Sequence, residues 1–186
     1  MKLNLGCGFY KLEGFVNVDK FANCEPDEVA DLEDFPWPWA DDSVDEVVMS
    51  HVLEHLGQET EVYFEIIKEL YRICADGAEV RITVPHPRHD DFINDPTHVR
   101  PVTVEALAMF SKKACDEFVA QKAANTPLAH ILGVDLEMED MKFTLEQPWL
   151  QKVQSGEMGD TELLLAIRQH NNVIKETSVR LRVKKG

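Results

Sequence analysis

The chain has 186 residues, of which 44% are hydrophobic and 28% charged, and its formal net charge is −15. This length and composition predict one soluble globular domain, residues 1–186, that buries about 70% of the surface exposed by the unfolded chain. The negative charge disfavours DNA and RNA as partners, because proteins bind phosphate backbones through Lys and Arg. No apolar run approaches the roughly 20 residues needed to cross a bilayer, so no membrane partner is expected.

The N-terminus shows no signal-peptide pattern, which indicates a cytoplasmic protein. Four scattered cysteines without a Cys-x-x-Cys pair are expected to be reduced thiols rather than a disulfide framework or a zinc ribbon. No feature of the sequence indicates an oligomeric state.

The first segment has the pattern of a strand that ends in a glycine turn, followed by a second strand that ends in a carboxylate. Residues 3–8 read Leu-Asn-Leu-Gly-Cys-Gly, and the apolar stretch 15–18 is followed by Asp19. A glycine turn lets the backbone approach a ligand, and a carboxylate at the next strand end can bind both hydroxyls of a ribose. Gly-x-Gly alone is explained equally well by the sterics of a tight turn. Together with Asp19 it predicts a nucleotide-like ligand at the carboxyl ends of parallel strands.

The spacing between these two strands is unusually short. Only residues 9–14 separate them, whereas parallel strands normally need a crossover of a dozen or more residues. A first helix can therefore have one or two turns at most. The spacing also argues against a nicotinamide-binding fingerprint, because Lys11 stands where a third glycine is needed and Asp19 comes too early.

Two apolar segments extend the pattern, with a loop between them. Residues 29–32 (Val-Ala-Asp-Leu) again place a carboxylate, Asp31, near the end of a short apolar piece. The prolines of Phe35–Trp39 exclude a central strand and predict a loop packed under the sheet edge. The continuous apolar run 47–49 is typical of a strand covered on both faces.

Apolar residues at helical spacing predict a helix over 60–74, with Thr60 as its N-cap and Gly77 after its end. In residues 79–85 polar and apolar side chains alternate, which predicts a strand. Strands that alternate with a helix in this order favour an α/β fold with a parallel sheet. The polar, His-rich segment 86–101 is expected to be a functional loop. Further expected elements are helical segments over 103–125, a strand over 134–143, a short helix capped by Asp160, and a final strand over 179–183.

As an ordered series, these motifs resemble those of class I S-adenosylmethionine-dependent methyltransferases. The similar segments are the glycine motif at 3–8, the ribose-binding strand end at 16–19, the adenine-contacting pair at 31–32, the fourth-strand motif at 45–56, and the helix and fifth strand within 70–85. The resemblance implies a Rossmann-like mixed seven-stranded sheet, mostly parallel with the last strand antiparallel, and helices on both faces. It also implies that residues 86–133 form an acceptor-side lid or insertion.

The resemblance further implies S-adenosylmethionine as the cofactor and no metal ion. The implied cofactor-binding residues are Asn4, Leu5, Gly6, Cys7, Gly8, Asp19, Lys20, Asp31, Leu32 and His51. Two departures from the family pattern stand out. Asn4 replaces an acidic residue, so that an amide replaces the carboxylate contact to the methionine end. Asp76-Gly77-Ala78 replaces the usual Pro-Gly-Gly, which changes a turn but no ligand contact.

Methyl transfer from a sulfonium is a direct displacement, so positioning and the exclusion of water can supply most of the acceleration without a covalent nucleophile. A hydroxyl or amine acceptor must lose a proton, and histidine suits that task. His51, His86 and His98 are the candidate bases, and His51 ranks first because it follows the fourth strand. The size and acidity of the chain favour a small-molecule acceptor, a metabolite or a sugar-like molecule.

Two alternatives remain open. His51-Val52-Leu53-Glu54-His55 matches the His-x-x-Glu-His pattern of inverted zinc peptidases, although the sequence identifies no third ligand. The chain can also be a domain that binds S-adenosylmethionine without catalysis, since the donor half of the site is the better defined half.

Overall fold

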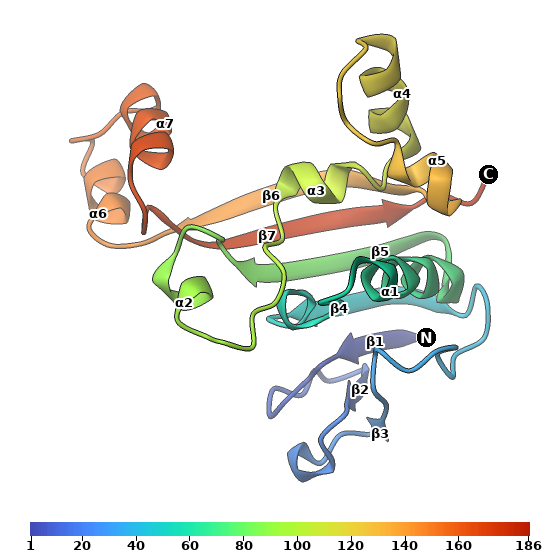
Figure 1. Cartoon of the computed structure of the whole chain (residues 1–186). Coiled ribbons are helices and arrows are strands. Elements are labelled where there is room, and N and C mark those ends of the chain that lie inside the picture. The colour runs from blue at the N-terminus through green and yellow to red at the C-terminus, as the bar shows by residue number, and fades with distance from the viewer.

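The computed structural model describes residues 1–186, which form a seven-stranded sheet in the order β3-β2-β1-β4-β5-β7-β6 (Figure 1). The strands are β1 (Lys2–Leu5), β2 (Val16–Asp19), β3 (Glu28–Val29), β4 (Val44–Ser50), β5 (Cys74–Pro85), β6 (Leu136–Leu145) and β7 (Ile174–Val183). Neighbouring strands from β3 to β5 pair in parallel, and β7 is antiparallel to both β5 and β6. The predicted Rossmann-like mixed sheet with an antiparallel last strand is confirmed.

The helices cluster in the second half of the chain. They are α1 (Thr60–Ile73), α2 (Asp90–Ile93), α3 (Val104–Ala108), α4 (Lys112–Ala120), α5 (Leu128–Leu132), α6 (Trp149–Gln154) and α7 (Asp160–Gln169), with 3-10 turns η1 (Ala22–Cys24) and η2 (Leu53–His55). The helical segment expected over 103–125 is divided in two, because the Ser111 side chain accepts a hydrogen bond from the backbone of Ala114 and starts α4 anew. No helix has the length and apolar character needed to cross a membrane.

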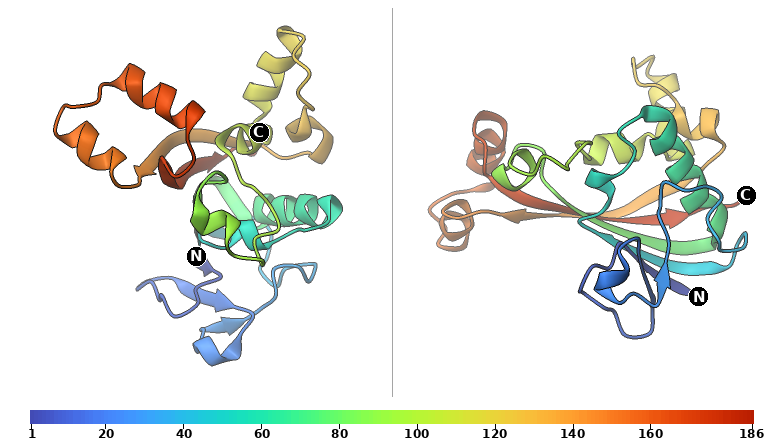
Figure 2. Two further views of the ribbon diagram at one scale, coloured as in Figure 1. Left: turned by 60° about the vertical axis from the view of Figure 1, so that its left-hand side comes forward. Right: turned by 60° about the horizontal axis from the view of Figure 1, so that its bottom comes forward.

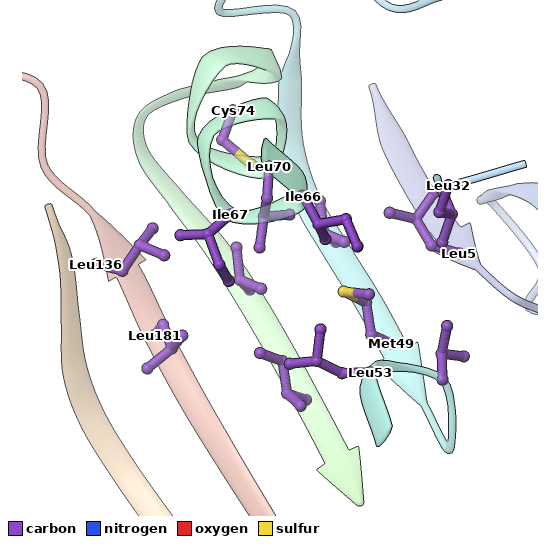
Figure 3. Packing of buried hydrophobic residues seen from close by; sticks show 14 of the residues in the cluster. Leu5, Leu32, Met49, Leu53, Ile66, Ile67, Leu70, Cys74, Leu136 and Leu181 are labelled. Atoms are coloured by element: carbon purple, nitrogen blue, oxygen red, sulfur yellow. The ribbon is translucent and has the colours of Figure 1, made fainter. Parts of the chain in front are cut away.

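One face of the sheet is apolar and carries the core. Its inward side chains, each at most 4% exposed, are Leu3, Leu5, Val47, Met49, Val80, Ile82, Val179 and Leu181. Helix α1 lies over β4 and β5 and packs Ile66, Ile67 and Leu70 onto this face (Figure 3). Helix α3 continues the cover over β6, with Leu107 and Phe110 buried in the same cluster. The core therefore lies between the sheet and a single helical layer.

The opposite face, which we call the polar face, carries a ladder of ion pairs instead of helices. The pairs run across five strands: Lys2 with Glu46 at 2.7 Å, Glu46 with Arg81, Arg81 with Glu79 at 3.6 Å, Glu79 with Arg182 at 3.4 Å, and Arg182 with Glu139 at 2.8 Å. Figure 2 shows α1 on the other side of the sheet, and α6 and α7, in orange and red, beyond the end of β6 and β7. The expectation of helices on both faces is wrong, as is that of a strand covered on both faces at 47–49, since Val48 lies on the polar face.

The handedness of the crossovers explains the bare face. Right-handed connections that step toward β3 cross one face of a sheet, and those that step toward β5 cross the other. The steps toward β3 are residues 6–15 and 20–27, which contain no α-helix and only the single turn η1. The side of the sheet that these two connections would cover therefore stays exposed, while the β4-to-β5 connection supplies α1 to the apolar side.

Side-chain amides hold the short connection between β1 and β2 in place of a helix. Asn4 donates from Nδ2 to the Tyr10 carbonyl and to Asn17 Oδ1, both at 2.9 Å. Asn17 Oδ1 also accepts from the Leu12 backbone at 2.8 Å, and Asn17 in turn donates to Asp27 at 2.8 Å. Both Asn4 and Asn17 are at least 95% buried, so this network satisfies polar groups that water does not reach.

The aromatic loop at 35–39 is anchored to α1. Trp37 and Trp39 are buried, and the Arg72 guanidinium donates to both of their backbone carbonyls at 3.0 Å and 2.9 Å. Glu69 accepts from Arg72 and also from the Trp37 backbone at 2.6 Å. The predicted loop is confirmed, and it closes the core beside α1.

The one-sided sheet gives a direct test with two adjacent residues of β5. Ile82→Ala is expected to lower the free energy of unfolding by about 2–5 kcal/mol, because it leaves a cavity in the core. Arg81→Ala lies on the polar face, where its side chain is 47% exposed, and is expected to cost less than about 1 kcal/mol. Urea denaturation measures both variants, and equal losses would show that the polar face is covered.

Candidate functional site

The glycine turn (residues 6–8) and the end of β2 are joined by hydrogen bonds at the carboxyl ends of adjacent parallel strands. Asp19 Oδ2 accepts from the Gly8 backbone at 2.8 Å, and Asp19 Oδ1 accepts from the Phe21 backbone at 2.9 Å. The Cys7 backbone donates to the Val18 carbonyl at 2.9 Å. A carboxylate offers about four acceptor positions, so Asp19 keeps capacity for two further donors.

Both glycines adopt positive φ angles, but only one of them is sterically confined. Gly6 has φ +66°, and a Cβ there would lie 2.4 Å from Cγ2 of Val52. Gly8 has φ +49°, and a Cβ there would meet no heavy atom within 4 Å. Val52 therefore leaves no room for a side chain at position 6. At position 8 no neighbouring atom excludes a side chain, and the backbone of Gly8 is open to a ligand.

A hollow of about 680 Å³ lies beyond the ends of β2 and β3 and is called the Asp31 hollow. Its lining includes Lys20, Phe21 and Asp31. Lys20 Nζ lies 3.9 Å from Asp31 Oδ2, so the two predicted side chains lie together. Leu32 is only 6% exposed, and its carbonyl accepts from the Trp37 indole at 3.1 Å. Of the sequence-predicted pair at 31–32, Asp31 lines this hollow, whereas Leu32 is buried and does not.

A second hollow of about 890 Å³ opens at the glycine turn and is called the His51 hollow. It is lined by predicted residues Asn4, Gly6, Cys7, Gly8 and His51, and by Tyr10, Leu12, Glu13, Phe15, Val48, Ser50, Arg81 and Thr83. Several of these residues lie on the polar face. Because no helix connects β1 and β2 across that face, the glycine turn is accessible from there. Leu5 is fully buried and does not line it. Burial raises the pKa of the Cys7 thiol, which keeps that group protonated.

His51 stands at the end of β4 with carboxylates near both ring nitrogens. Its Nε2 lies 3.1 Å from Glu176 Oε1 of β7, and its Nδ1 lies 3.6 Å from Glu54 Oε1. The neighbouring Glu54 carboxylate, together with Glu176, raises the pKa of His51 against the opposing effect of partial burial. Its backbone has φ +55°, which is uncommon for a residue with a side chain. Sequence reasoning missed Glu176, since nothing in an alternating strand marks one glutamate.

His86 occupies a different environment. It lines a small hollow with Arg88, Ile167 and Ile174 beside α7, and its Nδ1 accepts from the Arg88 backbone at 3.2 Å. Burial, followed by the charge of Arg88, lowers the pKa of His86. The structure does not bring His86 into the His51 hollow.

His98 joins Glu54 and His55 in a group that we call the Glu54 cluster. One potential ligand atom of each side chain lies within 4.8 Å of those of the other two. The His55 and His98 rings are 4.5 Å apart between centroids. The His-x-x-Glu-His pattern does not lie on one α-helix, because His51 precedes the 3-10 turn that carries Glu54 and His55. The sequence singled out His98 and the Glu54-His55 pair separately, without a signal that they meet.

Segments 86–103 and 104–132 differ in their surroundings. Residues 86–103 run past the carboxyl ends of β4 and β5, where Val99 and Arg100 donate backbone hydrogen bonds to the Glu54 carbonyl at 2.9 Å and 3.1 Å. In residues 104–132, Leu107 and Phe110 pack into the core. Residues 86–133 were expected to form an acceptor-side lid, and of these only 86–103 lie beside η2 and the end of β4.

No family model matches the sequence, and no curated protein matches it. Solved structures match over the whole fold. A SAM-dependent methyltransferase from Archaeoglobus fulgidus is 21% identical, with 97% of this chain and 85% of that chain covered and a TM-score of 0.63. The N-methyltransferase NodS from Bradyrhizobium japonicum is 14% identical, with coverages of 99% and 85% and a TM-score of 0.52.

The [4+2]-cyclase SpnF is 12% identical to this chain, with coverages of 100% and 75% and a TM-score of 0.54. These similarities establish that the chain has the class I methyltransferase fold. Because a cyclase shares that fold, the activity has to be argued from the residues of the site.

The steric difference between the two glycines can be tested. Gly6→Ala is expected to lower the free energy of unfolding by about 2–4 kcal/mol, the sum of a left-handed backbone and overpacking against Val52. Gly8→Ala is expected to cost about 1–2 kcal/mol, from the backbone alone. In a Val52→Ala background the two costs should converge in urea denaturation; a difference that persists would contradict the contact between Gly6 and Val52.

Proposed function

We propose that this protein is an enzyme that transfers a methyl group from S-adenosylmethionine to a small-molecule acceptor. The observation that carries the proposal is the hydrogen bond between Gly8 and Asp19, which joins a glycine turn to a strand-end carboxylate in a chain with the class I methyltransferase fold. Gly8 is open to a ligand, and Asp19 keeps two acceptor positions for ribose hydroxyls. The site therefore fits the cofactor.

The residues of the donor site divide the work of binding. Asp19 accepts the ribose hydroxyls, and Asp31 accepts the adenine amine, beside the Leu32 backbone and the Lys20 ammonium. The glycine turn places its backbone against the methionine end, where Asn4 holds the turn through its contacts with Tyr10 and Asn17. The cofactor supplies a sulfonium methyl group for direct displacement. Catalysis by the protein then consists of alignment and the exclusion of water.

His51 is proposed as the general base for the acceptor. It lines the hollow that contains the glycine turn, and Glu176 orients its ring at 3.1 Å. Its Nδ1 is left without a hydrogen-bond partner, because the Glu54 oxygen lies 3.6 Å away. When His51 accepts the proton, the Glu176 carboxylate stabilises the imidazolium. His86 and His98 lie in other environments, so the geometry favours His51 over both.

A small acceptor is supported by charge and by the shape of the site. The formal net charge of −15 repels phosphate backbones, so a metabolite or sugar-like molecule is the better substrate class. The His51 hollow has the size of a small-molecule site, at about 890 Å³.

The donor half is tested by calorimetry with S-adenosylmethionine. Asp19→Ala is expected to weaken binding by about 1.5–3 kcal/mol, roughly 10–150-fold, because hydrogen bonds to a charged group are lost. Asp116→Ala is the control, since Asp116 also accepts a hydrogen bond, from His130 at 2.8 Å, but lies outside the site. Unchanged affinity in Asp19→Ala, or equal losses in both variants, would refute the ribose assignment.

The transfer step is tested with labelled S-adenosylmethionine and a metabolite extract. The unmodified protein is expected to label a low-molecular-weight product, and His51→Gln should reduce the rate by about 10²–10⁴-fold, the usual contribution of a general base. His130→Gln is a control, because His130 also pairs with a carboxylate, Asp116 at 2.8 Å, but lies outside the site. Cofactor binding without labelling of any acceptor would favour the non-catalytic alternative.

A further inference from the structure

We infer that Glu54, His55 and His98 form a binding site for a divalent first-row transition-metal ion. The Glu54 cluster lies where η2, directly after β4, meets the segment that follows β5. The inference concerns the ion alone and does not depend on the proposed methyl transfer.

The side chain of Glu54 is the first reason for the inference. It is fully buried, and no protein donor lies within hydrogen-bonding distance of either carboxylate oxygen. The backbone of Glu54 is held firmly, because its carbonyl accepts from Val99 and Arg100. A buried carboxylate that lacks partners is costly unless a cation compensates it. The nearest ring nitrogen of His51, at 3.6 Å, belongs to a residue whose other nitrogen is bonded to Glu176.

The hydrogen bonds of the two imidazoles are the second reason, because they leave one nitrogen of each ring free to bind a metal. His98 Nδ1 lies 2.9 Å from the Phe92 carbonyl, which can only accept, so the proton is on Nδ1 and the lone pair on Nε2. His55 Nδ1 lies 3.0 Å from Thr97 Oγ1, whose own proton goes to Asp95 at 2.6 Å. Thr97 therefore accepts from His55 Nδ1, and His55 also has its lone pair on Nε2.

This pattern is that of metal-binding histidines. A ligating histidine donates its second ring N–H to a carbonyl or another acceptor, which fixes the tautomer and the orientation of the ring. Here both histidines do so through groups of one short segment, Phe92–His98. Asp95 supports this arrangement through Thr97 and lies 3.8 Å from His98 Nε2.

The donor set indicates the class of ion. One carboxylate and two imidazoles suit Zn²⁺, Mn²⁺, Fe²⁺ or Co²⁺ better than Mg²⁺ or Ca²⁺, which prefer oxygen ligands. The ligand atoms lie within 4.8 Å of one another, and metal–nitrogen distances near 2.0 Å require them to draw closer when the ion binds. Three protein ligands leave at least one coordination position open.

The inference is tested on the full chain after treatment with a chelator. Titration with Co²⁺ is expected to show one equivalent of bound ion with visible ligand-field bands, and Zn²⁺ is expected to displace it. Glu54→Gln and His98→Gln should each weaken Co²⁺ binding at least 10-fold. His130→Gln, which alters a histidine–aspartate pair elsewhere, should bind as the unmodified protein does.

Circular dichroism shows whether each variant is folded, and His98→Gln keeps the test decisive if Glu54→Gln does not fold. The inference is overturned if the unmodified protein binds no Co²⁺ at a tenfold excess. It is also overturned if the folded variants bind Co²⁺ with unchanged stoichiometry, affinity and spectrum.

Discussion

The connection from β1 to β2 constrains the rest of this structure. Residues 6–15 must carry the chain back along the sheet to start a parallel strand, and they are too few to include a helix as well as two turns. Hydrogen bonds of the buried Asn4 and Asn17 side-chain amides hold this connection in place of a helix. One face of the sheet is left without cover as a result, and the His51 hollow opens onto that face. The geometry around the glycine turn and the polarity of the whole sheet thus have a common origin.

Sequence patterns predicted the elements whose stability is local or whose burial is periodic. The strands β5 and β7 are of this kind, because every second residue faces the core, and so is α1, where every third or fourth residue does. The bare face was also visible in the sequence, in the charges that alternate with Val80 and Ile82, but the family resemblance suggested a second helical layer. Short elements such as α5 and α6 gave no periodic signal. Strand β5 begins at Cys74, directly after α1, so Gly77 lies within the strand and not after the end of a helix as expected.

The donor half of the site was more predictable than the acceptor half for a topological reason. Asp19 ends a strand, and Gly8 and Asp31 come shortly after one; the carboxyl ends of neighbouring parallel strands meet at one edge of the sheet. His86 and His98 lie in a long segment whose path depends on contacts with α7 and η2, which no local pattern encodes. Glu176, which orients His51, comes from a strand 125 residues away. The burial of Glu54 is likewise a property of the folded chain, since the sequence shows only a glutamate between Leu53 and His55.

The polar face has a thermodynamic consequence for the whole molecule. The heat capacity of unfolding rises with the apolar surface that becomes exposed and falls with the polar surface. A sheet with one hydrated side exposes less new apolar surface on unfolding than a three-layer domain of equal length. The heat capacity change should therefore lie below the usual value of about 12–15 cal/mol/K per residue, and the dependence of stability on temperature should be flatter. Because the ion pairs from Lys2 to Glu139 keep this face hydrated, the free energy of unfolding should have a broad, shallow maximum as a function of temperature.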